Sequence, residues 1–132
     1  MARPQIAVLD NDGTQLAILA EVLESEGYAV ATLDDLRQGY VFVKACQPAL
    51  VTLDLLQERQ PLGIEVIRVL RADRDTRDIA ILVVSADTQA RKTQAERFRA
   101  DGIGVLGKPY DLDELLGLVR QQLPADELAT ES

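Results

Sequence analysis

Several short apolar runs of the sequence end in polar side chains of the kinds used in phosphoryl chemistry. These side chains are Asp10-Asn11-Asp12, Asp54, Ser85 and Lys108. A carboxylate can attack phosphorus, other carboxylates can hold a hard divalent cation, and a hydroxyl and an ammonium can contact phosphoryl oxygens. The chain contains no His, so it has no imidazole for general base chemistry or for carrying a phosphoryl group. The residue types therefore indicate phosphoryl transfer on a carboxylate.

The first acidic cluster has two interpretations. With Gly13 and Thr14 it reads Asp-x-Asp-Gly-Thr, which resembles the first motif of the haloacid dehalogenase phosphohydrolases. That resemblance implies a phosphatase in which Asp10 is the nucleophile and Asp12 is the acid and base. Such a phosphatase also needs a second acidic cluster after a late strand, where this sequence offers only the acids of a helix start. The phosphatase interpretation leaves Asp54 without a purpose.

Composition limits the alternatives. The 132 residues suffice for one domain, with 47% hydrophobic and 27% charged residues, as in globular proteins. The single Cys46 cannot form an internal disulfide, and we find no signal-like start and no membrane-length apolar run. A net charge of -8 does not favour nucleic acid binding through a basic surface. We therefore expect a cytoplasmic protein with no direct nucleic acid partner and no membrane contact.

The elements that must position these side chains alternate along the chain. Apolar runs predict strands at 5–10, 28–33, 49–55, 79–85 and 103–107. Helical periodicity follows each of them at 14–27, 35–46, 63–72, 88–102 and 111–123, with Thr14 as a candidate N-cap of the first helix and Gly39 weakening the second. This pattern predicts a five-stranded, parallel, doubly wound α/β fold with helices on both faces. Ligands of such folds bind beyond the carboxyl ends of the strands, where the polar side chains lie.

Five stretches together carry a resemblance to a known family. They are AVLDND, LESEGYAV, PALVTLDLL, IAILVVSAD and VLGKPYDLDELL, in this order between about residues 4 and 123. The chain resembles the receiver domain of two-component response regulators, related to the chemotaxis response regulator. This resemblance implies a flavodoxin-like receiver domain at 1–123, a short acidic tail at 124–132, and a signalling domain rather than an enzyme. We expect its output to pass through another protein.

The resemblance also implies a role for each site residue. Asp54 would accept a phosphoryl group from a histidine kinase or phosphotransfer protein. Mg²⁺ would be held by Asp10, Asp54 and the backbone carbonyl of Leu56. Lys108 would contact a phosphoryl oxygen, with a cis peptide bond to Pro109, and Ser85 would donate a hydrogen bond to the phosphoryl group.

Two positions depart from the family pattern. The second acid of the family's metal-binding pair falls on Asn11, a neutral ligand that would weaken Mg²⁺ binding unless Asp12 turns inward to replace it. Val105 stands where receivers place a Tyr or Phe that swings inward on activation. These departures leave open a degenerate receiver that binds partners without phosphorylation.

Partner contacts are expected on one face. This face comprises the helices at 88–102 and 111–123 and the strand at 103–107, and it would meet a downstream protein or form a homodimer. The helix at 88–102 is rich in Arg and Lys, which favours an acidic partner. The loop QERQPLG after Asp54 is about one residue longer than in typical receivers and would reshape partner contacts.

Overall fold

The computed structural model describes residues 3–123, and the expected acidic tail at 124–132 lies outside the described residues. Strands and helices alternate as the sequence predicts. In chain order the elements are β1 (Gln5–Leu9), α1 (Gly13–Ser25), β2 (Ala29–Leu33), the 3₁₀ turn η1 (Leu36–Gln38), α2 (Gly39–Cys46), β3 (Leu50–Leu53), α3 (Leu62–Ala72), β4 (Ala80–Ser85), α4 (Thr88–Ala100), β5 (Gly104–Gly107) and α5 (Leu112–Gln122).

The strands form one parallel sheet in the order β2-β1-β3-β4-β5. The strand order reverses direction between β1 and β3, and the crevice of a doubly wound sheet lies beyond the carboxyl ends at that reversal. The predicted flavodoxin-like α/β fold is therefore confirmed. Within residues 3–123 no helix is both long and apolar enough to span a membrane.

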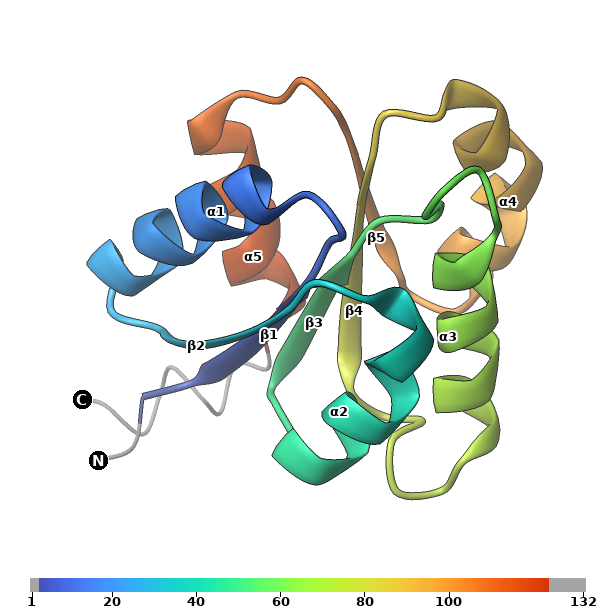
Figure 1. Ribbon diagram of the computed structural model, residues 1–132, viewed down its shortest axis with the longest axis horizontal. Helices are drawn as coiled ribbons and strands as arrows, with labels where there is room; N and C mark the ends of the chain where they lie inside the picture. Colours follow the sequence, from blue (N-terminus) through green and yellow to red (C-terminus); the bar gives the residue numbers. More distant parts are fainter. Residues whose placement is uncertain (1–2, 124–132) are drawn as a thin grey trace.

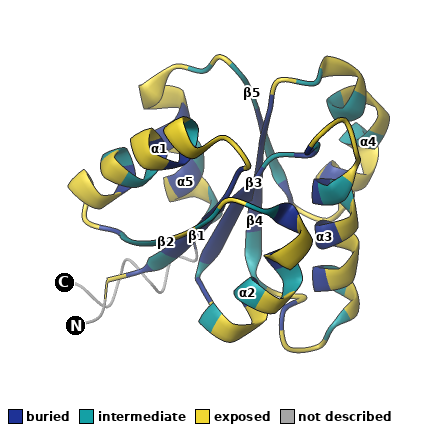
Figure 2. Ribbon diagram, in the orientation of Figure 1, coloured by how far each residue is buried: buried dark blue, intermediate teal, exposed yellow. Residues whose placement is uncertain are grey.

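Helices cover both faces of the sheet, with α1 and α5 on one face and α2, α3 and α4 on the other (Figure 1). Alternate residues of each strand supply two separate cores. In β4, for example, Leu82 packs in the core with α1 and α5, whereas Ile81 and Val83 pack in the core with α3 and α4. The buried sheet and the exposed outer surfaces of the helices are visible in Figure 2. Burial on both faces explains why the strands are almost entirely apolar.

The start of α1 differs from the prediction. Helix α1 begins at Gly13, and its N-cap is Asp12 instead of Thr14. The Asp12 Oδ1 atom accepts hydrogen bonds from the backbone N–H groups of Thr14 (3.0 Å) and Gln15 (3.2 Å). Thr14 already lies inside the first turn, so its N–H is one of the donors that the cap must satisfy.

The helix predicted at 35–46 is divided into two parts. The 3₁₀ turn η1 precedes α2, which begins at Gly39. A Cβ atom on Gly39 would lie 2.9 Å from Cγ2 of Val66 and 3.1 Å from a methyl of Leu9. Gly39 therefore permits close packing of α2 at the point where the backbone turns.

Candidate functional site

Two carboxylates from adjacent strands meet at the carboxyl edge of the sheet. Asp10 follows β1 and Asp54 follows β3, and the Asp54 N–H donates to the Leu9 carbonyl at 3.4 Å. Each carboxylate is oriented by a backbone N–H two residues later. Asp10 Oδ1 accepts from the N–H of Asp12 at 3.0 Å, and Asp54 Oδ1 accepts from the N–H of Leu56 at 3.2 Å.

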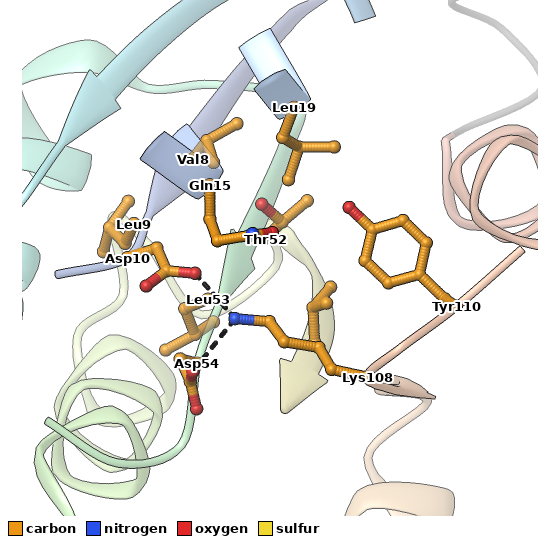
Figure 3. Close-up of a pocket in the computed structure, with 11 residues that line it drawn as sticks. Val8, Leu9, Asp10, Gln15, Leu19, Thr52, Leu53, Asp54, Lys108 and Tyr110 are labelled. Atoms are coloured by element: carbon orange, nitrogen blue, oxygen red, sulfur yellow. Dashed lines mark hydrogen bonds and ion pairs between the residues drawn. The ribbon is translucent and has the colours of Figure 1, made fainter. Parts of the chain in front are cut away.

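The two carboxylates share the ammonium of Lys108, which follows β5. The Lys108 Nζ atom donates to Asp10 Oδ2 at 2.8 Å and to Asp54 Oδ2 at 3.2 Å, as the dashed lines in Figure 3 mark. Burial lowers the pKa of Lys108, but the hydrogen bonds and charges of Asp10 and Asp54 outweigh burial, so the pKa is raised from its ordinary value. The ammonium is therefore held in its charged form between two acids.

Ser85 is the last residue of β4, the strand next to β3 in the sheet. Ser85 is fully buried at the end of β4, and its Oγ accepts from the N–H of Asp87 at 3.2 Å. The side chains of Asp54 and Ser85 line an open hollow of about 310 Å³ together with Leu56, Ala86 and Asp87. Asp87 caps α4 through the N–H of Ala90, so Ser85 does not serve as the helix cap.

A small cavity lies beneath the ion pair. Its volume is about 10 Å³, on the scale of one water molecule. Gln15 of α1 and Tyr110, which follows Pro109, line it beside Lys108 (Figure 3). Burial raises the pKa of Tyr110, which Lys108 lowers and Asp10 raises to smaller extents. The Lys108 stem is thus enclosed by neighbours from α1 and from the segment before α5.

The groups at the described site that could bind a metal ion are all oxygen donors. The Asp10 and Asp54 carboxylates and the nearby Leu56 carbonyl are hard donors that suit Mg²⁺. Asn11 and Asp12 are both exposed, and the Asp12 carboxylate is occupied in capping α1. Within residues 3–123, no group of three or more His, Cys, Asp or Glu side chains is arranged to hold a metal ion. The donor set fits Mg²⁺ with two carboxylates and with neutral oxygens for the rest.

Residues 6–120 match the model of the response regulator receiver domain. The chain belongs to the response regulator receiver family. This membership replaces the phosphohydrolase interpretation, in which Asp12 would need to work beside Asp10 instead of capping a helix.

Relatives of this receiver include longer proteins. It is 36% identical over 121 residues to the DNA-binding response regulator MtrA of Mycobacterium tuberculosis, an alignment that covers 92% of this chain and 51% of MtrA. The chain thus spans about half the length of the curated relatives it matches.

Among solved structures, a sensor protein from Polaromonas is 31% identical, with a TM-score of 0.79 and coverage of 91% of this chain and 95% of that one. The receiver domain of a sensor histidine kinase from Pseudomonas aeruginosa has the same fold, with a TM-score of 0.77, 20% identity and coverage of 92% of this chain and 98% of that one. That structure holds a magnesium ion in its active site cleft.

The peptide bond between Lys108 and Pro109 is cis in this receiver, as predicted. Val105 is half-buried and packs on the core with α3 and α4. Nearby, the guanidinium of Arg91 lies against Gly107, where a Cβ atom would be 2.6 Å from one of its nitrogens. The Arg91 Nε is buried and has no hydrogen-bond partner among the described residues. The space beside β5 is therefore occupied by an arginine from α4 and not by an aromatic ring from β5.

Sequence reasoning missed Gln57, which lies three residues after Asp54. Its side chain is 3% exposed and bonds to the segment that follows β2. A polar residue in a loop rich in polar residues carries no signal of burial. Its burial becomes visible only in the structure, where the segment at Asp35 and Leu36, about twenty residues earlier in the chain, contacts the Gln57 side chain.

Proposed function

We propose that this receiver accepts a phosphoryl group on Asp54 from a histidine kinase or phosphotransfer protein and signals through protein contacts. The observation that carries the proposal is the shared ammonium of Lys108, which holds Asp54 against Asp10 at the edge of a hollow that Ser85 also lines. The proposal retains the cytoplasmic location expected from the sequence. The DNA binding in MtrA's name belongs to a protein about twice as long, and the net charge of -8 favours protein partners for this chain.

The transfer step is a displacement at phosphorus. An Asp54 carboxylate oxygen attacks the phosphorus of a phosphohistidine, and a P–O bond forms as the P–N bond breaks. The bonding electrons leave with the imidazole nitrogen, which takes up a proton. The Lys108 ammonium stabilises negative charge on a phosphoryl oxygen, and Ser85 Oγ–H donates to another. The receiver then holds the group as an acyl phosphate and carries out no reaction on a separate substrate.

Mg²⁺ would supply charge neutralisation at this site when bound. Asp10, Asp54 and the Leu56 carbonyl are the residues that would hold it, with the Asn11 amide in place of the second acid. A neutral amide attracts a divalent cation less than a carboxylate does. We therefore propose that Asn11 weakens Mg²⁺ binding and slows phosphorylation without abolishing it.

The groove between α4 and β5 supports partner contact on the expected face. It has a volume of about 440 Å³, with an apolar floor that includes Phe98, Ile103 and Val105. Arg91, Lys92 and Arg99 line the same groove, which favours an acidic downstream partner. A homodimer through α4, β5 and α5 is the alternative use of this face.

A second candidate function is a degenerate receiver that binds its partner without phosphorylation. The exposed Asn11 and the aliphatic Val105 favour it, because Asn11 replaces an acidic metal ligand with a neutral one and Val105 replaces the usual switch aromatic. In this alternative the fold serves as a constant binding surface. The two candidates differ in their response to a phosphoryl analogue.

The decisive experiment is phosphodonor labelling of the whole chain and of Asp54→Ala, each with and without Mg²⁺. We expect acid-labile, hydroxylamine-sensitive label on the native chain in Mg²⁺ and none on Asp54→Ala. Beryllofluoride with Mg²⁺ should also raise the melting temperature of the native chain, because a ligand of the folded state stabilises it. Absence of both label and thermal shift would favour the degenerate receiver, and label on Asp10 would contradict both candidates.

A further inference from the structure

The loop between β3 and α3 contains a small hairpin directly after the site. Gln57 and Gln60 pair in an antiparallel bridge, with N···O distances of 3.0 and 2.8 Å. Between them, Glu58 (φ 52°) and Arg59 (φ 65°) both adopt left-handed backbone conformations. Residues other than glycine rarely adopt this conformation, so surrounding contacts must maintain the turn.

The side chain of Gln57 connects the hairpin to the segment between β2 and α2. Its Oε1 accepts from the N–H of Leu36 at 2.7 Å, and its Nε2 donates to Asp35 Oδ1 at 2.9 Å. Both ends of the buried amide are therefore satisfied by this one segment. Separating them would leave buried polar groups without partners, which is unfavourable. On the surface, Arg37 and Glu58 form an ion pair at 3.0 Å across the same two segments.

The chain between Asp54 and Gln57 has little freedom to move independently. Leu55 is fully buried, and its carbonyl accepts from the N–H of Gly63 at 3.0 Å. A Cβ atom on Gly63 would lie 1.9 Å from the Asp54 carbonyl oxygen, so the start of α3 is pressed against the site backbone. A shift of Leu56 therefore has to carry Gln57 with it.

Chemistry at Asp54 acts directly on this segment. The N–H of Leu56 donates to Asp54 Oδ1, which is an anionic acceptor in the free carboxylate. Conversion to an acyl phosphate makes the carboxyl carbonyl neutral, and a neutral oxygen is a weaker acceptor than a carboxylate. A weaker bond allows the Leu56 peptide to shift, and Leu56 is the residue before Gln57.

We propose that Gln57 is a positioning residue that transmits the state of Asp54 to Leu36 and Arg37 at the entrance to α2. This inference rests on the proposed function and adds a second response element to it. The site has no aromatic at position 105, whereas the Gln57 link leads from the reacting carboxylate to η1 through bonded neighbours. The β2–α2 segment is then part of the surface that distinguishes the two states.

The test is amide NMR of the whole chain with Mg²⁺ and beryllofluoride as the phosphoryl analogue. In the native chain we expect shift changes at Leu36 and Arg37 as well as at residues 85–87. Gln57→Leu replaces the amide with an apolar side chain of similar size and so removes both hydrogen bonds. It should reduce the Leu36 and Arg37 changes at least twofold and leave those at 85–87 intact.

Glu58→Gln is the matched control on the same hairpin, because it removes the charge of the Arg37 ion pair and retains the Gln57 link. It should preserve the native response at Leu36.

If Gln57 only supports the loop, Gln57→Leu would alter the resting spectrum without changing the response to beryllofluoride. Changes at 85–87 with none at Leu36 and Arg37 in the native chain would overturn this inference alone. An unchanged response in Gln57→Leu would also overturn it, and no change anywhere would overturn the proposed function with it.

Discussion

At the scale of single residues, the site contains a small number of charged groups, and these determine how strongly it can attract a cation. Two carboxylates, Asp10 and Asp54, face one ammonium, and the third acid expected of a receiver is replaced by Asn11. Asp12 is close in sequence but is held at the start of α1 by two hydrogen bonds. Under the proposed function, we therefore expect position 11 to control the Mg²⁺ affinity of the site.

Restoring the acid at position 11 should strengthen Mg²⁺ binding. For Asn11→Asp we expect about tenfold tighter binding, equivalent to about 1.4 kcal/mol, and faster Mg²⁺-dependent labelling of Asp54. Titration of Mg²⁺ followed by tyrosine fluorescence measures the affinity. Asp12→Asn is the comparison, because Asn also caps helices, and it should change affinity by less than about threefold. Equal affinities for Asn11→Asp and the native chain would contradict this assignment.

We expect Lys108 to make the free energy of unfolding depend on pH in the alkaline range. Its raised pKa means that the folded state holds the proton more tightly than the unfolded state does. The resulting stabilisation is fully present below the ordinary pKa of 10.5 and is lost as pH rises through the raised value. Lys108→Met should therefore be less stable than the native chain by about 1–3 kcal/mol at pH 8, with the difference shrinking above pH 10.5.

Urea unfolding at a series of pH values measures this difference. Lys92→Met on exposed α4 is the control and should change the free energy of unfolding by less than about 0.5 kcal/mol. A Lys108→Met deficit that stayed constant up to pH 12 would show that packing of the stem, and not the ammonium, accounts for it.

At the scale of elements, the sequence predicts those features of the fold that are set by a local pattern of residues. Apolar runs, helical periodicity and glycines locate the strands and helices and put the reactive side chains at strand ends. The structure differs from the prediction where a feature is set by contact between segments that are far apart in the chain. Val66 leaves little room for a side chain at Gly39, and Gln57 is buried where Leu36 and Asp35 lie opposite it. Neither relationship is visible in local sequence.

The contact between α3 and the site backbone makes Gly63 intolerant of any side chain. Gly63→Ala should lower the free energy of unfolding by about 3 kcal/mol or more, because its Cβ would overlap the Asp54 carbonyl. Gly117→Ala is the matched control, since that glycine lies exposed within α5 with no atom within 4 Å of the added Cβ. It should raise stability by about 0.5–1 kcal/mol. Denaturant melts of both variants check the contrast, and a mild effect at Gly63 would mean that α3 can move away from the site.

At the scale of the whole molecule, the sheet separates two cores. Ile6 belongs to the core with α1 and α5, and Ile81 belongs to the core with α3 and α4. Their strands, β1 and β4, are separated by β3. The two side chains therefore contact different neighbours on opposite faces.

Substitutions on the two faces should act independently. Ile6→Val and Ile81→Val should each cost about 0.5–1.5 kcal/mol, and the double variant should equal their sum within about 0.5 kcal/mol. Urea unfolding of the four proteins completes the cycle. A larger coupling energy would mean that strain passes through the sheet from one core to the other.

The close approach at Gly63 also has a consequence for the timescale on which this part of the molecule opens. The first turn of a helix normally frays and exchanges its amide hydrogens quickly. Here the Gly63 amide donates to the carbonyl of fully buried Leu55, beside the central strand β3. Hydrogen exchange at Gly63 should therefore be as slow as in the strands, and much slower than at Ala90, whose amide is held by the Asp87 side chain. We therefore expect the backbone around Asp54 to open slowly, so that under the proposed function the phosphorylation state would change many times while the fold stays closed.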